Sequence, residues 1–149
     1  MSESISIATL AKRFDLERCR HCGACSQACP SAKAGGVLPD AVVDSVLREE
    51  EPEGIWDCLL CHRCMAACPV DIDIVMLMTR LRHRSALAGE APDRFRRTGG
   101  ILIREGRGFP TSRRVETQRK SLGLEPLLSS EKAQKEMEII IARTRFAHD

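Results

Sequence analysis

The chain of 149 residues contains few aromatic side chains: four Phe, one Trp and no Tyr. Aromatic rings bury more area than any other side chains, so their scarcity leaves the packing of a core to aliphatic residues. We therefore expect bound groups and partner surfaces to supply part of the stability of the fold.

Long hydrophobic runs are also lacking. The longest purely apolar run covers residues 74–78, whereas a membrane-spanning helix needs roughly 20 such residues. The N-terminus has no basic segment followed by the apolar stretch of a secretory signal. We expect a soluble, cytoplasmic protein with no membrane span.

Cysteine is abundant, and its eight copies lie in two runs of identical spacing. Each run reads C-x-x-C-x-x-C-x-x-x-C-P, and no cysteine lies outside them. In a reducing compartment, closely spaced thiols are metal ligands more often than disulfide partners. The runs are Cys19, Cys22, Cys25 and Cys29 before Pro30, and Cys58, Cys61, Cys64 and Cys68 before Pro69.

This spacing is typical of [4Fe-4S] clusters. Two-residue gaps let three cysteines surround one side of a cubane cluster, and in two-cluster ferredoxins the fourth cysteine of such a run ligates the other cluster. A four-cysteine zinc site usually has two C-x-x-C pairs, and the compartment disfavours disulfides. The predicted ligands are a first set of Cys19, Cys22, Cys25 and Cys68, and a second set of Cys58, Cys61, Cys64 and Cys29.

The segments around the runs have helical periodicity. Apolar residues behind Pro39 predict a helix that ends before Gly54, and a second helix is predicted after Pro69, capped by Asp71 or Asp73. The first turns of the second helix are apolar all round, which predicts burial. Neither flank alternates with a period of two, so we predict an all-α fold, an alpha-helical ferredoxin domain rather than the small β-rich bacterial type.

The distribution of charge changes along the chain. Residues 1–79 carry 7 Lys and Arg against 12 Asp and Glu, whereas residues 80–120 carry 12 against 4. Glycines interrupt this basic part, where we expect short helices near 93–104 and 111–121. Ala133, Met137, Ile140 and Ile141 have the spacing of an amphipathic helix from about 130 to 145.

We therefore predict three parts: an N-terminal extension (1–18), a two-cluster domain (19–90) and a basic, helical C-terminal extension (91–149) that docks on a partner. The last helix packs either on its own domain or on another subunit. The basic segment is either a solvated face or a surface for an acidic partner. Because aromatic interleaving is absent and the net charge is only +2, we expect no nucleic acid partner.

The remaining candidate groups in the runs are histidines and methionines. All eight ligand places are filled by cysteine, so we interpret His21 and His62 as solvent-facing or backbone-bonded. Met65, Met76 and Met78 are interpreted as packing residues.

The two runs, the stretch from Trp56 to Ile74 and the basic tail resemble the C subunit of heterodisulfide reductase, strongly over residues 19 to about 80. The same cysteine motif occurs in the iron-sulfur subunits of succinate dehydrogenase and of glycolate or glycerol-3-phosphate oxidising enzymes, which carry further domains. This chain has no Cys-Cys-Gly motif and no Gly-x-Gly-x-x-Gly nucleotide fingerprint.

The resemblance implies a non-catalytic electron-transfer subunit in a hetero-oligomer. It would relay electrons between two proteins of a heterodisulfide reductase-type complex. One resembles the flavin-containing A subunit of that enzyme, and the other resembles its B subunit, whose Cys-Cys-Gly motifs build the disulfide-reducing or thiol-oxidising centre. Two alternatives stay open: a diffusible two-[4Fe-4S] ferredoxin, and an iron-sulfur regulator that binds nucleic acid.

Overall fold

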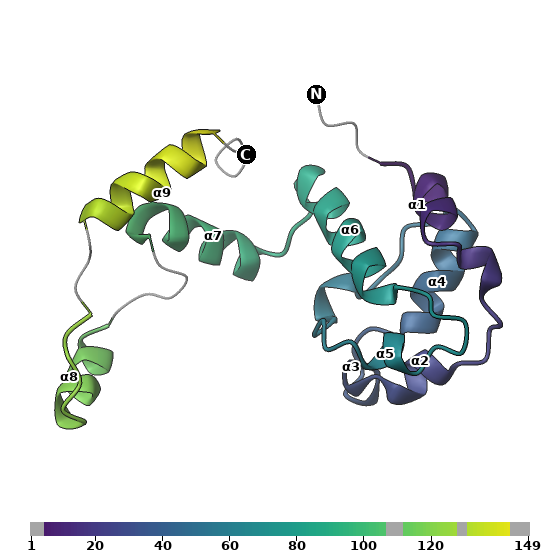
Figure 1. Ribbon diagram of the computed structural model, residues 1–149, viewed down its shortest axis with the longest axis horizontal. Coiled ribbons are helices and arrows are strands. Elements are labelled where there is room, and N and C mark those ends of the chain that lie inside the picture. The colour runs from purple at the N-terminus through teal and green to yellow at the C-terminus, as the bar shows by residue number, and fades with distance from the viewer. Residues whose placement is uncertain (1–4, 107–111, 128–130, 144–149) are drawn as a thin grey trace. The chain divides into compact units, whose positions relative to one another are not determined.

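A computed structural model describes residues 5–106, 112–127 and 131–143, and within these ranges the chain is all-helical with no strand, as predicted (Figure 1). No helix in the described part is long and apolar enough to cross a membrane. The chain divides into two compact units, Met1–Glu90 and Ala91–Asp149. The helices of the first unit are α1 (Ile7–Arg13), η1 (Leu16–Arg18), α2 (Ala24–Ala28), α3 (Pro30–Lys33), α4 (Pro39–Leu47), η2 (Ile55–Asp57), α5 (Arg63–Ala66) and α6 (Ile74–Leu87).

The first unit repeats its local structure around the two cysteine runs. Each position in the first run has a counterpart 39 residues later, as Cys19 has in Cys58. The 3-10 turn η1 precedes the first run and η2 precedes the second, and the short helices α2 and α5 occupy equivalent places and lie against each other. The repeated sequence therefore encodes a repeated fold.

The core of this unit is aliphatic. Its fully buried side chains come chiefly from α1, α4 and α6, where Leu10, Val46 and Leu77 are 0% exposed. Asp73 is the residue that begins α6, because its side chain accepts a hydrogen bond from the backbone N–H of Met76 at 2.9 Å. The prediction that the first turns of α6 are buried all round is wrong at Met76, which is 43% exposed. The other four residues of 74–78 face the core, so the side of the helix that carries Met76 faces the solvent.

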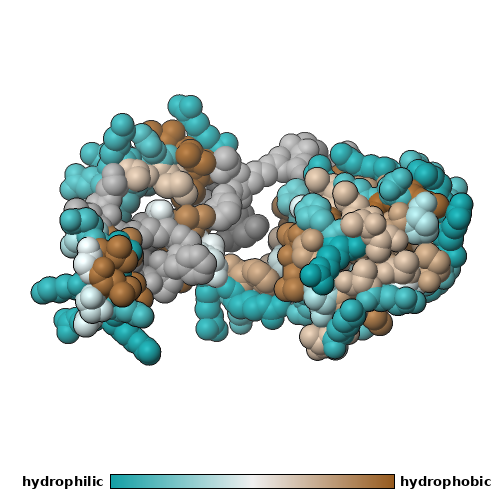
Figure 2. Space-filling view, turned by 60° about the horizontal axis from the view of Figure 1, so that its bottom comes forward, coloured by the Kyte–Doolittle hydropathy of each residue, from teal (hydrophilic) through white to brown (hydrophobic). Residues whose placement is uncertain are grey.

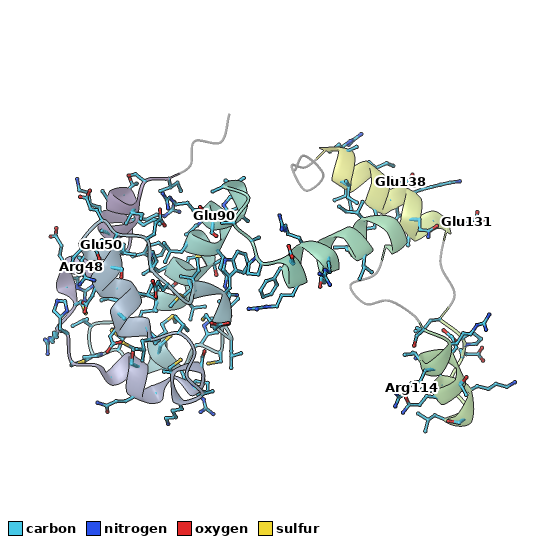
Figure 3. The ribbon with its side chains drawn as sticks, turned by 180° about the vertical axis from the view of Figure 1, so that it is seen from behind. Arg48, Glu50, Glu90, Arg114, Glu131 and Glu138 are labelled. Carbon is cyan, nitrogen blue, oxygen red and sulfur yellow. The ribbon has the colours of Figure 1, made fainter. Side chains whose placement is uncertain are left out.

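The second unit contains α7 (Asp93–Glu105), α8 (Arg113–Ser121) and α9 (Glu131–Arg143). Gly99 and Gly100 do not interrupt α7, which ends one residue before Gly106, a glycine with a φ of 64°. Helix α9 lies against α7 (Figures 1 and 3). The predicted start of α8 at residue 111 and the predicted ends of α9 at 130 and 144–145 lie outside the described residues.

Contact between α9 and α7 means that the last helix packs within its own unit. Ile141 is buried and Met137 is half-buried, in agreement with the predicted apolar face. Ile140, predicted on the same face, is 54% exposed, and Ile139 beside it is 53% exposed. The helix therefore presents two large apolar side chains outside its own packing face.

Candidate iron-sulfur centres

Both cysteine runs begin with the same unusual backbone conformation. The residue two positions after the first cysteine has a positive φ, 51° at His21 and 50° at Leu60. This conformation points the backbone N–H back at the cysteine, so His21 donates to Cys19 Sγ and Leu60 to Cys58 Sγ, each at 3.4 Å. Such amide–sulfur bonds stabilise a negative charge on the sulfur and are among the factors that set a cluster's potential.

A second left-handed residue starts the short helix of each run. Gly23 (φ 71°) precedes α2, and His62 (φ 64°) precedes α5. The left-handed region is unfavourable by roughly 1–2 kcal/mol for a residue with a Cβ, whereas glycine adopts it without this penalty. His62 thus adopts a strained backbone to turn the chain around its site. The only signal in the sequence that could have marked this conformation is the alignment of His62 with Gly23 in the repeat.

The first set lines one cavity of about 70 Å³. Three of its cysteines come from the first run, and Cys68 comes from the end of the second. Cys68 Sγ also accepts a hydrogen bond from the backbone N–H of Ile72 at 3.4 Å. Four cysteines around one small cavity are the donor set that a [4Fe-4S] cluster requires, so the residues here fit this cofactor.

In the second set, Cys29 and Cys64 are the most enclosed cysteines, each only 7% exposed. Burial raises the pKa of the Cys64 thiol, and the nearby Cys58 and Cys29 raise it further. Cys29 is thus close enough to the second run to affect the ionisation of one of its members.

A hydrogen bond from a buried hydroxyl holds the end of the first run against the start of the second. Ser31, two residues after Cys29 and 7% exposed, donates its hydroxyl to the carbonyl of Asp57 at 2.8 Å. Asp57 immediately precedes Cys58, so this bond keeps Cys29 beside the second run. The sequence analysis did not single out Ser31.

Helix α6 supports the second site through Arg82. Its guanidinium donates to the carbonyls of Ile55, at 2.8 Å, and of Cys58. It also lies over the ring of Trp56, with 5.5 Å from Arg82 Cζ to the ring centroid. These contacts fix the turn η2 that leads into the second run and place a positive charge beside one of its cysteines.

Helix α4 places two carboxylates at the first site. Asp40 and Asp44 line the same cavity as the first set. Asp40 Oδ1 accepts the Ser26 hydroxyl, and Asp44 Oδ1 bonds to Nδ1 of His21 at 2.8 Å. Burial raises the pKa of the Cys25 thiol from 9.0 to about 11, and the negative charge of Asp40 adds to this rise.

One cysteine in each run is exposed to solvent, Cys22 in the first and Cys61 in the second. The two residues before Cys61 are exposed and apolar, with Leu59 65% and Leu60 37% exposed. Met65, interpreted from sequence as a packing residue, is also 36% exposed. Figure 2 brings the end of the unit with α2, α3 and α5 forward, and hydrophobic residues gather there within a hydrophilic rim.

Comparison with known families defines the class of this domain. Residues 15–72 match the family model described as a 4Fe-4S dicluster domain. Together with the eight cysteines, the match identifies the cofactors as two [4Fe-4S] clusters.

Similar proteins extend the comparison beyond this domain. The chain is 26% identical over 131 residues to the C subunit of the ferredoxin:CoB-CoM heterodisulfide reductase of Methanosarcina mazei, covering 85% of this chain and 81% of that protein. It is 29% identical over 140 residues to the iron-sulfur C 2 subunit of the CoB–CoM heterodisulfide reductase of Methanocaldococcus jannaschii, covering 88% and 75%. A protein of Archaeoglobus profundus, named as similar to the heterodisulfide reductase C subunit, is 30% identical over 92 residues, covering 54% and 47%. The chain is therefore similar, over most of its length, to C subunits of heterodisulfide reductases.

Proposed function

We propose that this chain is the electron-relay subunit of a heterodisulfide reductase-type complex, with one [4Fe-4S] cluster held by the first set and one by the second. The observation that carries the proposal is the single cavity lined by cysteines of both runs. When bound, each cluster supplies a one-electron carrier. The chain supplies the thiolates, the amide donors at His21 and Leu60, and the burial around Cys29 and Cys64.

The contacts at both sites support the proposal of interleaved ligands. Cys68 lines the cavity of the first run, and the Ser31–Asp57 hydrogen bond keeps Cys29 beside the second run. We expect Cys68→Ser to disturb the cluster held by the first run, and Cys29→Ser the cluster held by the second. Low-temperature EPR of the reduced variants distinguishes the two signals. Disturbance of the cluster of the substituted cysteine's own run, in both variants, would contradict the interleaving.

Relay requires that electrons can reach each site from outside. Cys22 and Cys61 are exposed, one at each site, whereas the other cysteines are half-buried or buried. An exposed ligand lets a partner's redox centre approach from that side. The exposed apolar side chains of Leu59 and Leu60 beside Cys61 would be covered, and water excluded from them, when a partner binds there.

The proposed partners are a flavin-containing protein like the A subunit of heterodisulfide reductase, and a protein with Cys-Cys-Gly motifs like its B subunit, assembled in the cytoplasm. The similar proteins are named as subunits of heterodisulfide reductases, and this supports a hetero-oligomer. The second unit is the proposed docking extension, since α9 exposes Ile139 and Ile140 and the preceding segment is basic. Large exposed apolar side chains of this kind favour an interface.

Purification at native expression level tests this proposal. An affinity tag on this chain should recover the untagged A-like and B-like proteins in constant ratio. The double substitution Ile139→Glu and Ile140→Glu should lower that recovery while the absorbance of the clusters stays unchanged. The double substitution Lys135→Gln and Glu138→Gln, at two exposed residues of the same helix, is the matched control.

Two results would favour the alternatives. A monomer that exchanges electrons freely with many acceptors would indicate a diffusible ferredoxin. Specific DNA binding with a steep negative dependence on salt concentration would indicate a regulator, because each phosphate contact releases counterions.

A further inference from the structure

The two sites have the same backbone and different electrostatic surroundings. Cys25 and Cys64 occupy equivalent positions in the repeat. The carboxylate of Asp40 lines the cavity of the first set together with Cys25. The second run instead has a cation, Arg82, bonded to the carbonyl of Cys58.

The arginines inside the runs do not account for this difference. Each run contains one, Arg20 in the first and Arg63 in the second. Arg20 lines the cavity of the first set, but both arginines are exposed residues, so solvent screens their charges. The asymmetry therefore comes from the helices that pack on the runs, α4 with Asp40 and α6 with Arg82.

Asp40 approaches the first run directly. Its Oδ2 lies 3.7 Å from the position that a Cβ on Gly23 would occupy, and Gly23 is the residue that follows Cys22. The residue is held there by three hydrogen bonds: the Ser26 hydroxyl and the Ala41 N–H donate to Oδ1, and the Asp40 N–H donates to Ser26 Oγ at 3.1 Å. These donors are neutral, so the negative charge of Asp40 is oriented without being cancelled.

Asp44 differs from Asp40 in this respect. It lines the same cavity one helical turn later, but its carboxylate bonds to the imidazole of His21 at 2.8 Å, and both side chains are well exposed to solvent. Solvent and the imidazole weaken its effect on the site. Asp40 is therefore the acidic residue that acts most directly on the first set.

We propose that Asp40 sets the order of the two reduction potentials: its carboxylate holds the cluster of the first set at a lower potential than the cluster of the second set, where Arg82 has the opposite effect. A negative charge repels the electron that a cluster gains on reduction, and a positive charge attracts it. One electron that enters at the first site then passes to the second, so the first is oxidised as the second is reduced. The clusters thus give the relay a direction, from the Cys22 edge to the Cys61 edge.

The inference rests on the proposed relay and on the interleaved ligands, and its test is independent of any partner. Midpoint potentials of both clusters are measured by redox titration of the purified, cluster-loaded full chain, with EPR as the readout. Cys22→Ser and Cys61→Ser, one exposed ligand of each set, assign the two signals. If no partner copurifies and the potentials are ordered as stated, the relay fails and this inference stands.

The informative substitution is Asp40→Asn, which removes the charge and keeps the acceptor oxygen. We expect the first cluster's midpoint to move to a more positive value, with the second cluster's midpoint unchanged. Asp40→Glu, which keeps the charge, should restore most of the difference. Equal midpoints in the native chain, or an Asp40→Asn variant in which neither midpoint moves, would overturn the proposal.

A matched control removes a charge from the other end of the same helix. Glu50 follows α4 and pairs with Arg48 at 2.9 Å, and both are labelled in Figure 3. The seven residues of α4 that follow Asp40 span roughly 10 Å at 1.5 Å per residue, and Glu50 lies beyond them. Glu50→Gln should leave both midpoints in place, and a shift equal to that of Asp40→Asn would show that the effect is not local.

A second variant keeps the proposal testable if Asp40→Asn does not load its clusters. Ser26→Ala removes two of the three hydrogen bonds that hold Asp40 against the first run, so the carboxylate is free to move away from the site. The first cluster's midpoint should then move to a more positive value, in the same direction as in Asp40→Asn. A shift to a more negative value, or an unchanged midpoint, would refute the proposed role of the carboxylate.

Discussion

Gly36 lies at the contact that joins the two cysteine runs, and its replacement by alanine should weaken that contact. A Cβ on Gly36 would lie 2.4 Å from Ser31 Oγ, 3.2 Å from the Ser31 carbonyl oxygen and 3.3 Å from Asp57 Cβ. The Ser31 hydroxyl cannot move away without breaking its bond to the Asp57 carbonyl. The backbone of Gly36 itself is not left-handed, so the obstacle is the hydroxyl.

The expected cost has two parts. Overpacking costs about 1–3 kcal/mol, and loss of the part-buried hydrogen bond costs about 0.5–1.5 kcal/mol. Replacing a glycine returns about 0.4–1 kcal/mol through the unfolded chain. Gly36→Ala should therefore lower the free energy of unfolding by about 0.5–4 kcal/mol, and Ser31→Ala alone by about 0.5–1.5 kcal/mol.

A double-mutant cycle isolates the clash. In a Ser31→Ala background the 2.4 Å contact is gone, so adding Gly36→Ala should cost less than about 1 kcal/mol. The assay is urea unfolding followed by the helical circular dichroism signal, under anaerobic conditions and at matched iron content. Additive costs at Ser31 and Gly36 would refute the reasoning.

Gly35 provides the matched control for this cycle. It has a φ of 79° and no atom within 4 Å of its virtual Cβ. Gly35→Ala should cost about 1–2 kcal/mol from backbone strain alone. The cost should be the same in the native chain and in the Ser31→Ala background, since no contact links the two positions.

Two further predictions concern a helix start and a buried thiol. Asp73→Ala removes the side-chain cap of α6 and should lower the free energy of unfolding by about 0.5–2 kcal/mol, measured in the same urea assay, with Asp73→Asn close to the native value. In the cluster-free chain at pH 8, the rise of the Cys25 pKa from 9.0 to about 11 lowers its thiolate fraction about 100-fold, so mass spectrometry should find Cys25 alkylated long after the exposed Cys22. Equal labelling of Cys25 and Cys22 at pH 8 would contradict this prediction. Because the folded state binds the thiol proton of Cys25 more tightly than the unfolded state, its contribution to the stability of the fold is present below pH 9 and is lost as the pH rises towards 11.

The helices could be predicted from periodicity where their apolar residues face a core. Helices α4 and α6 begin at or near the predicted Pro and Asp signals, since these signals act within one turn of the chain. Exposure at Met76 and Ile140 could not be predicted in this way. The residue type of an apolar side chain is the same whether it faces the core or the solvent. Its exposure depends on which neighbouring helices cover it, and local periodicity does not specify those helices.

The cysteine pattern identified the cofactors. It did not identify the backbone conformations of the two runs or the side chains that contact them. The left-handed residues His21, Leu60 and His62 are not glycines, so no local signal marks them. The position of Asp40 over the first run depends on contact between α4 and α2, which are separated in the sequence. Arg82 and Ser31 donate hydrogen bonds to backbone carbonyls. Every residue has such a carbonyl, so the sequence does not indicate which one a side chain will contact. The interleaved ligand sets stay a prediction.

The cavity that draws cysteines from both runs has a consequence for synthesis of the chain. After Cys25 has been added to the growing chain, 43 more residues (68 − 25) are needed to reach Cys68. With interleaved ligands, a nascent chain that ends between the runs carries three thiols of the first set and one of the second, and no complete site. Cluster insertion is then a late step, and a truncated chain cannot retain a finished centre.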